Sequence, residues 1–94
     1  MKMTTNNRDK SIDASEAGKI IPKRTGVRFN NLDHLVSAAR TINIHVDYGK
    51  YYRVENIKQE RDQQGKNYFL INISEFGSVP FHQMWFSDIK QSIY

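Results

Sequence analysis

The chain of 94 residues contains no cysteine, two prolines and only five glycines. The absence of cysteine excludes a disulfide scaffold, a thiolate zinc site, iron–sulfur ligation and a cysteine nucleophile. The glycines are scattered and form no phosphate-binding loop. No apolar run approaches the roughly 18 residues of a membrane-spanning helix, and residues 1–10 lack the apolar stretch of a secretory signal. We therefore expect a cytoplasmic protein that has no membrane partner.

The histidines and serines match no pattern typical of a metal or catalytic site. His34, His45 and His82 lie too far apart in the chain for a metal motif, and no serine stands at a strained turn between a strand and a helix. We therefore predict no enzyme, no metal and no cofactor. The sequence leaves one enzyme class open, a small metal-free ribonuclease that works with Arg, Tyr and His side chains on a sheet. Tyr51, Arg53 and His82 are its candidate residues.

Positive charge is concentrated at the beginning of the chain. The net charge is +4, and residues 1–30 carry all of it, because basic and acidic residues balance in 31–94. All the aromatic residues lie at Phe29 or later. A largely polar segment cannot bury enough apolar surface to offset the entropy of ordering its backbone. The sequence therefore predicts a disordered basic tail over residues 1–22 and a single small β-rich domain over 23–94.

Hydrophobic periodicity predicts one helix. Leu32, Leu35, Val36 and Ala39 fall on one face of a helix over residues 31–41. An asparagine is expected to cap its start, because a side-chain oxygen there can accept from the free amides of the first turn. The segment is long enough for about three turns.

The rest of the chain shows the two-residue period of strands. Residues 50–76 predict a long β-hairpin with a polar turn at 60–66, and a single helical turn is expected at 87–90. The other expected strands are 26–29, 42–48 and 81–86. Short antiparallel strands of this kind form a small barrel or a curled sheet. We expect an α+β fold, mostly β, with four or five strands and one short helix.

Several short motifs resemble a known family. They are GKYYRV at 49–54, YFLIN at 68–72, EFG at 75–77 and MWFSDI at 84–89. They are similar to the small SH3-like β-barrel proteins of phages and mobile elements, over about residues 42–90. The resemblance implies an SH3-like barrel and an accessory or regulatory role. It implies no catalytic residues, because the members of this family have varied or unknown roles. The helix at 31–41 and the basic tail depart from the family's pattern.

Exposed aromatic and basic side chains predict a protein-binding surface. Tyrosine and arginine dominate the residues that contribute most to protein interfaces. The candidates are Tyr51, Arg53, Tyr68 and His82. The alternative is that these side chains only pack against their neighbours across the strands. We predict a non-enzymatic module that binds a host protein, because the body of the domain, residues 31–94, carries no net charge. The module is expected to be a monomer or a homodimer.

Nucleic acid is the second partner that the sequence allows. Cations along an arm that orders on binding neutralise phosphates, and tyrosines on a sheet stack with bases. The candidates are Lys19, Lys23, Arg24, Arg28 and Lys50. The alternative for these cations is a tail that only increases solubility.

Overall fold

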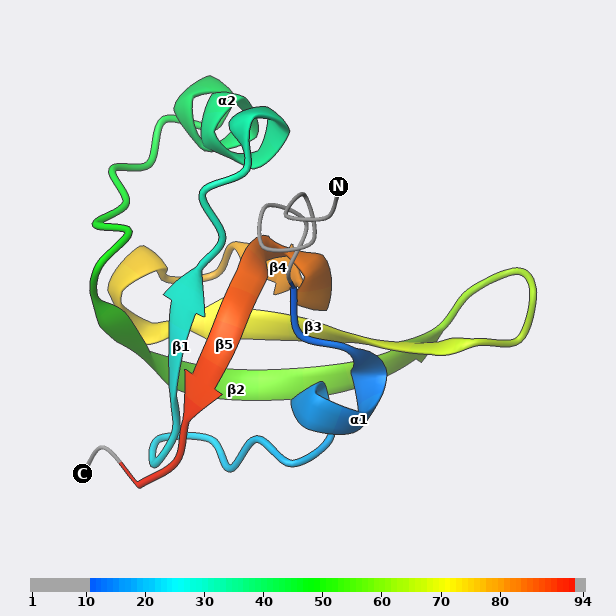
Figure 1. Cartoon of the computed structure of the whole chain (residues 1–94). Coiled ribbons are helices and arrows are strands. Elements are labelled where there is room, and N and C mark those ends of the chain that lie inside the picture. The colour runs from blue at the N-terminus through cyan, green and yellow to red at the C-terminus, as the bar shows by residue number, and fades with distance from the viewer. Residues whose placement is uncertain (1–10, 93–94) are drawn as a thin grey trace, which may run out of the picture.

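The structure, a computed structural model, describes residues 11–92. Five strands form one antiparallel sheet in the order β4-β3-β2-β1-β5 (Figure 1). The elements are α1 (Ala14–Ala17), β1 (Gly26–Phe29), α2 (Asp33–Thr41), β2 (Tyr51–Arg61), β3 (Asn67–Ile73), the 3₁₀ turn η2 (Ser74–Phe76), β4 (Pro80–His82), the 3₁₀ turn η3 (Gln83–Trp85) and β5 (Phe86–Lys90). The mostly β fold is confirmed. Within the described residues the sheet is not closed into a barrel, because β4 and β5 are its two ends and do not pair with each other.

Strand β2 joins the two halves of the sheet. Its first residues pair with β1, and the run from Val54 to Arg61 pairs with β3. The register shifts between Val54 and Asn56, so Glu55 is an extra residue in the strand. Such a bulge bends a strand and increases its twist. In Figure 1, β1 and β5 accordingly run steeply across the β2–β3 hairpin.

The concave side of the sheet holds an aromatic core. The Phe29 ring lies 4.8 Å from the ring of Phe86 and 5.2 Å from that of Phe81, measured between centres. It also meets the rings of Tyr52 and Phe76 at 5.3 and 5.8 Å. The contact with Phe86 is tilted and the other three are edge-on. Such contacts at these distances add to the gain from apolar burial. Phe29 therefore joins β1, β2, β4 and β5 in one packed cluster.

The segment preceding β1 belongs to this core, which corrects the predicted tail for residues 11–22. Ile12, Ala17 and Ile20 are at most 6% exposed. The Ile12 amide donates to the Phe86 carbonyl at 2.9 Å, and a capping box at Asp13 begins α1. The segment is polar in composition, but its few apolar residues suffice to pack on the sheet. The first ten residues of the predicted tail lie outside the described residues.

Helix α2 confirms the predicted helix, but its cap and the strand expected after it are wrong. Leu32 occupies the cap position, and Asn30 accepts from the Leu32 amide through its side chain at 3.3 Å. Residues 42–48 form no strand. Asn43 takes a left-handed conformation (φ 61°), and the Ile44 amide donates back to the Ala39 carbonyl. These local bonds turn the chain away from an extended course.

The hairpin is confirmed, whereas the last elements differ from the prediction. The predicted strand 81–86 is split, because residues 83–85 form η3, and β5 replaces the turn expected at 87–90. Long-range contacts explain both differences. The buried Gln83 side chain accepts from the Phe69 amide at 2.9 Å, and Ile89 of β5 is paired with Val27 in the middle of β1. No helix within residues 11–92 is long and apolar enough to cross a membrane.

Candidate protein-binding surface

On the convex side of β1, β2 and β5, donors surround the carboxylate of Asp88. The register places Arg28 opposite both Tyr51 and Asp88. Arg28 donates through Nε and Nη2 at 3.0 and 2.9 Å, Ser87 Oγ donates at 3.1 Å, and the Tyr51 hydroxyl completes the set. The guanidinium of Arg28 and the ammonium of Lys90 lie 5.1 and 5.7 Å from the centre of the Tyr51 ring. The cluster therefore holds an aromatic ring among cations on the sheet surface.

The electrostatics of this cluster hold each of its two acidic groups in one protonation state at neutral pH. Burial favours the neutral form of Asp88, but hydrogen bonds from Tyr51 and Ser87 and the charge of Arg28 outweigh it and hold the pKa of Asp88 below its usual value. The hydrogen bond that Tyr51 donates to Asp88 raises the pKa of Tyr51, and burial raises it to a smaller extent. At neutral pH the carboxylate is thus ionised and the phenol keeps its proton. A phenol held in this way is a poor general base.

The cations predicted to contact nucleic acid do not lie along a separate arm. They are Lys19, Lys23, Arg24, Arg28 and Lys50. Arg28 is in the middle of the sheet, in the Asp88 cluster. Lys23 pairs with Glu55 at 3.8 Å, and Lys50 pairs with Glu75 at 2.9 Å, where its ammonium also lies over an aromatic ring. Three of the five predicted cations are therefore balanced by carboxylates of the same chain.

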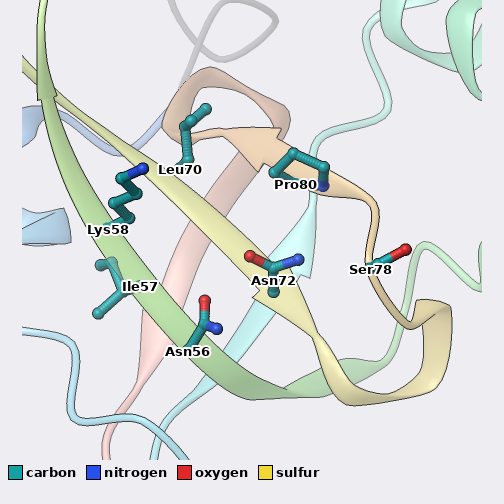
Figure 2. A pocket seen from close by; sticks show the side chains of 7 residues that line it. All are labelled: Asn56, Ile57, Lys58, Leu70, Asn72, Ser78 and Pro80. Carbon is teal, nitrogen blue, oxygen red and sulfur yellow. The ribbon is translucent and has the colours of Figure 1, made fainter.

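A hollow of about 430 Å³ lies on the convex side of the other half of the sheet. Its lining comes from β2, β3, β4 and the loop before β4: Asn56, Ile57, Lys58, Leu70, Asn72, Ser78 and Pro80. The register places Asn72 between Asn56 and Pro80, and Figure 2 looks onto this row. Leu70 lies in the next row, beside Lys58. We call this set of lining residues the outer face.

An aromatic stack adjoins the outer face. The rings of Tyr68 and His82 lie 5.0 Å apart and are nearly parallel, at 14°. His82 is opposite Leu70 in the sheet, and its Nδ1 accepts from the Met84 amide at 3.0 Å, which caps η3. The side chain of Met84 is 44% exposed. The stack thus extends the outer face with half-buried and exposed apolar surface.

The four residues predicted to bind protein are therefore divided between two places on the convex side. Tyr51 and Arg53 lie on the β1–β2–β5 half, and Tyr68 and His82 lie beside the hollow. His82 lies in the same row of the sheet as Lys58, two strands away. Lys58 follows Arg53 by five residues in β2, which is roughly 16 Å along a strand. Such a separation exceeds the reach of hydrogen bonds. The three candidate ribonuclease residues are thus not assembled at one place.

The residues that line the hollow were not predicted from the sequence. Asn56, Asn72 and Pro80 come from three strands, and only the register of the sheet brings them into one row. Asp88 was missed because the segment that contains it was expected to be a turn. One signal was present: within the predicted hairpin, Leu70 lies in the strand phase opposite to that of the core residues Ile71 and Ile73.

Protonation of His82 is expected to weaken the fold. Burial lowers the pKa of His82, so the unfolded chain binds this proton more readily than the folded chain. The contribution to stability is complete above about pH 6.5 and is lost as the pH falls through the lowered folded-state pKa. The free energy of unfolding should therefore fall between about pH 7.5 and pH 5.5, by more than in a His82→Gln variant. An equal fall in His82→Gln and the wild type would contradict this assignment, and His45→Gln, at an exposed position, is the matched control.

No protein family, curated protein or solved structure was found to match this chain. The resemblance to SH3-like proteins of phages and mobile elements stays a prediction.

Proposed function

We propose that this chain is a non-enzymatic protein-binding module, and that its partner docks on the outer face. The observation that carries the proposal is the hollow over β2, β3 and β4 (Figure 2). A sheet face that only contacts solvent is not expected to place Leu70, Pro80 and the edge of Ile57 around an open space of this size. Concave sites that bind ligands combine apolar walls with a few polar groups in the same way.

The charge of the outer face favours a polypeptide over nucleic acid. Lys58 is the one ionisable side chain among the residues lining the hollow, and it pairs with Glu60 at 3.1 Å. A site for a phosphate backbone needs several cations, because each phosphate contact contributes through charge neutralisation. The pairing leaves the outer face close to neutral.

The side chains of the outer face suit an extended protein segment. The amides of Asn56 and Asn72 lie opposite one another across β2 and β3. Each can donate and accept at once, which is what the backbone of an extended segment requires. Leu70 and Pro80 then provide the apolar contact for a side chain of that segment. A host protein as partner, and an accessory role in a phage or mobile element, are parts of this proposal that rest on the sequence alone.

Site-specific crosslinking tests the proposal. A photo-reactive amino acid in place of Lys58 should give a protein adduct in the cells in which the chain occurs naturally. Lys58 is exposed and lines the hollow, so the probe is next to any bound segment. The same probe in place of Gln64, at the exposed tip of the hairpin, should not give this adduct. An adduct that nuclease digests would contradict a protein partner.

A charge placed in the hollow should abolish that adduct. Leu70→Arg introduces a cation where the partner's apolar side chain is expected, and burying an unpaired charge at an interface is costly. Ile21→Arg is the matched control, because Ile21 is 49% exposed and lies outside the outer face. Unfolding by denaturant must first show that both variants are folded. An adduct that persists in Leu70→Arg, or forms equally at position 64, would overturn the proposed site.

A further inference from the structure

Residues 32–48 form a lobe beside the sheet. In Figure 1, α2 lies at one end of the molecule, and the chain returns from it to β2 as a coil. Leu35 and Ala39 of α2 are buried, but neither belongs to the core cluster around Phe29. The Ile44 amide of the coil donates to the Ala39 carbonyl at 3.1 Å, and the Ile44 side chain packs against the core. The coil thus packs both on the helix and on the core.

A hollow of about 210 Å³, which we call the helix hollow, lies between α2 and this coil. Its lining residues are Val36, Ala39, Arg40, Ile44, His45, Val46 and Tyr48. Positions 36, 39 and 40 share one face of the helix, because residues three and four apart are neighbours there. Sites for small molecules are usually larger, at about 300–1,000 Å³. The helix hollow therefore has room for about one side chain of a partner.

The helix hollow combines apolar walls with two hydrogen-bond donors, the guanidinium of Arg40 and the hydroxyl of Tyr48. Within residues 11–92 neither side chain donates a hydrogen bond, and Arg40 forms no ion pair. The two groups are close enough to interact: burial raises the pKa of Tyr48, and the charge of Arg40 lowers it to a smaller extent. The phenol therefore keeps its proton at neutral pH and can donate. None of the described residues that line the hollow carries a carboxylate.

We infer that the helix hollow is a second binding site, for a polypeptide segment in which an apolar side chain lies next to a carboxylate. The apolar side chain contacts Val36, Ile44 and Val46, and the carboxylate accepts hydrogen bonds from Arg40 and Tyr48. A guanidinium presents its donors in a geometry that matches a carboxylate, and charged hydrogen bonds of this kind are roughly twice as strong as neutral ones. The helix hollow is separate from the outer face, so this inference goes beyond the proposed function.

A polypeptide fits the helix hollow better than a nucleic acid strand. Arg40 is the one arginine or lysine among the residues that line it, whereas affinity for a phosphate chain depends on several cations. Ile42 lies in the chain between Arg40 and Ile44, and its side chain is 46% exposed. A neighbouring residue of a polypeptide gains apolar contact there, and a phosphate chain does not.

Two small probes test the inference by amide NMR on the full chain at neutral pH. They are N-acetyl-leucine and N-acetyl-leucinamide, which differ only in a carboxylate against an amide. N-acetyl-leucine should shift the amide signals of Ala39, Arg40 and Val46, with a Kd on the order of a few millimolar for a ligand of this size. The leucinamide probe should bind about tenfold more weakly, because it cannot accept the same charged hydrogen bonds.

Two variants remove the donors and keep the apolar walls. Arg40→Gln should weaken the binding of N-acetyl-leucine about tenfold, to the level of the leucinamide probe, and Tyr48→Phe should weaken it about threefold. Arg24→Gln is the matched control, because Arg24 is exposed and does not line the helix hollow. It should leave the affinity unchanged. The amide spectrum of each variant without probe shows directly that the variant is folded.

Several results would overturn the inferred site. They are equal binding of the two probes, no shift within residues 36–48, or equal losses of affinity in Arg40→Gln and Arg24→Gln. Single-stranded oligothymidylate is a third probe. If it shifts the same amides and loses affinity in Arg40→Gln but not in Arg24→Gln, the helix hollow binds nucleic acid and the polypeptide partner is wrong. The crosslink from position 58 tests the outer face alone, so either site can fail without the other.

Discussion

Replacing Phe29 with alanine should cost about 3–5 kcal/mol of unfolding free energy, the range measured for truncating buried aromatic side chains. Phe29 is 2% exposed and touches four other aromatic rings, so its removal leaves a cavity where β1, β2, β4 and β5 meet. A domain of this size has only about 5–10 kcal/mol of stability to lose. The midpoint of guanidinium unfolding, followed by tryptophan fluorescence from Trp85, measures the effect.

Two further variants keep this prediction testable even if Phe29→Ala does not fold. Phe29→Leu retains most of the apolar volume and should lose about 1–2 kcal/mol. Phe76→Ala removes a ring from the half-buried border of the same cluster and should cost less than Phe29→Ala. Equal midpoints for Phe76→Ala and Phe29→Ala would show that Phe29 is not the centre of the core.

Ile20→Ala should destabilise the protein by about 2–5 kcal/mol, whereas Ile21→Ala should change the free energy of unfolding by less than about 0.5 kcal/mol. The two positions are adjacent and have the same side chain, but Ile20 is 6% exposed and Ile21 is 49% exposed. Chemical denaturation of the two variants measures the difference directly. It is a sharp test of whether the segment before β1 is part of the fold.

A disordered tail would give the opposite result. Both isoleucines would then be solvated in the folded protein, and neither substitution would shift the unfolding midpoint. Ile12→Ala adds an independent check, because Ile12 is 2% exposed and its amide donates to β5. A loss at Ile12 and Ile20 together with none at Ile21 would establish that residues 11–22 cover one edge of the core.

Local periodicity was a reliable guide where the deciding contacts are close in sequence. The hairpin of β2 and β3 follows from alternating side chains on both strands and from Gly65, whose φ of 83° suits the turn between them. Helix α2 follows from the spacing of Leu35 and Ala39, which are its buried residues. The two strands of the hairpin are neighbours in the chain, and the spacing that predicts α2 lies within a single segment.

Distant contacts determined the elements that differ from the prediction. Residues 42–48 alternate like a strand but do not pair with another strand, and the side chains of Ile44, Val46 and Tyr48 pack against the core from a coil. Conversely, β5 has little strand pattern and exists because β1, far away in sequence, pairs with it. A strand is stabilised by its neighbours, so alternation alone does not determine whether it forms.

The candidate binding surface shows the same division. The sequence by itself determined that the fold is mostly β, that residues 31–94 carry no net charge and that thiol chemistry is excluded, and it identified Tyr51, Arg53, Tyr68 and His82 as candidate binding residues, which are exposed or half-exposed. Only the tertiary structure decided which of these lie together, because the bulge at Glu55 and the order of the strands separate Tyr51 and Arg53 from the Tyr68–His82 stack. It also brought Asn56, Asn72 and Pro80 into one row and Arg28 to Asp88. The physical reason is that composition and periodicity are properties of a chain, whereas a surface is made by the register between strands.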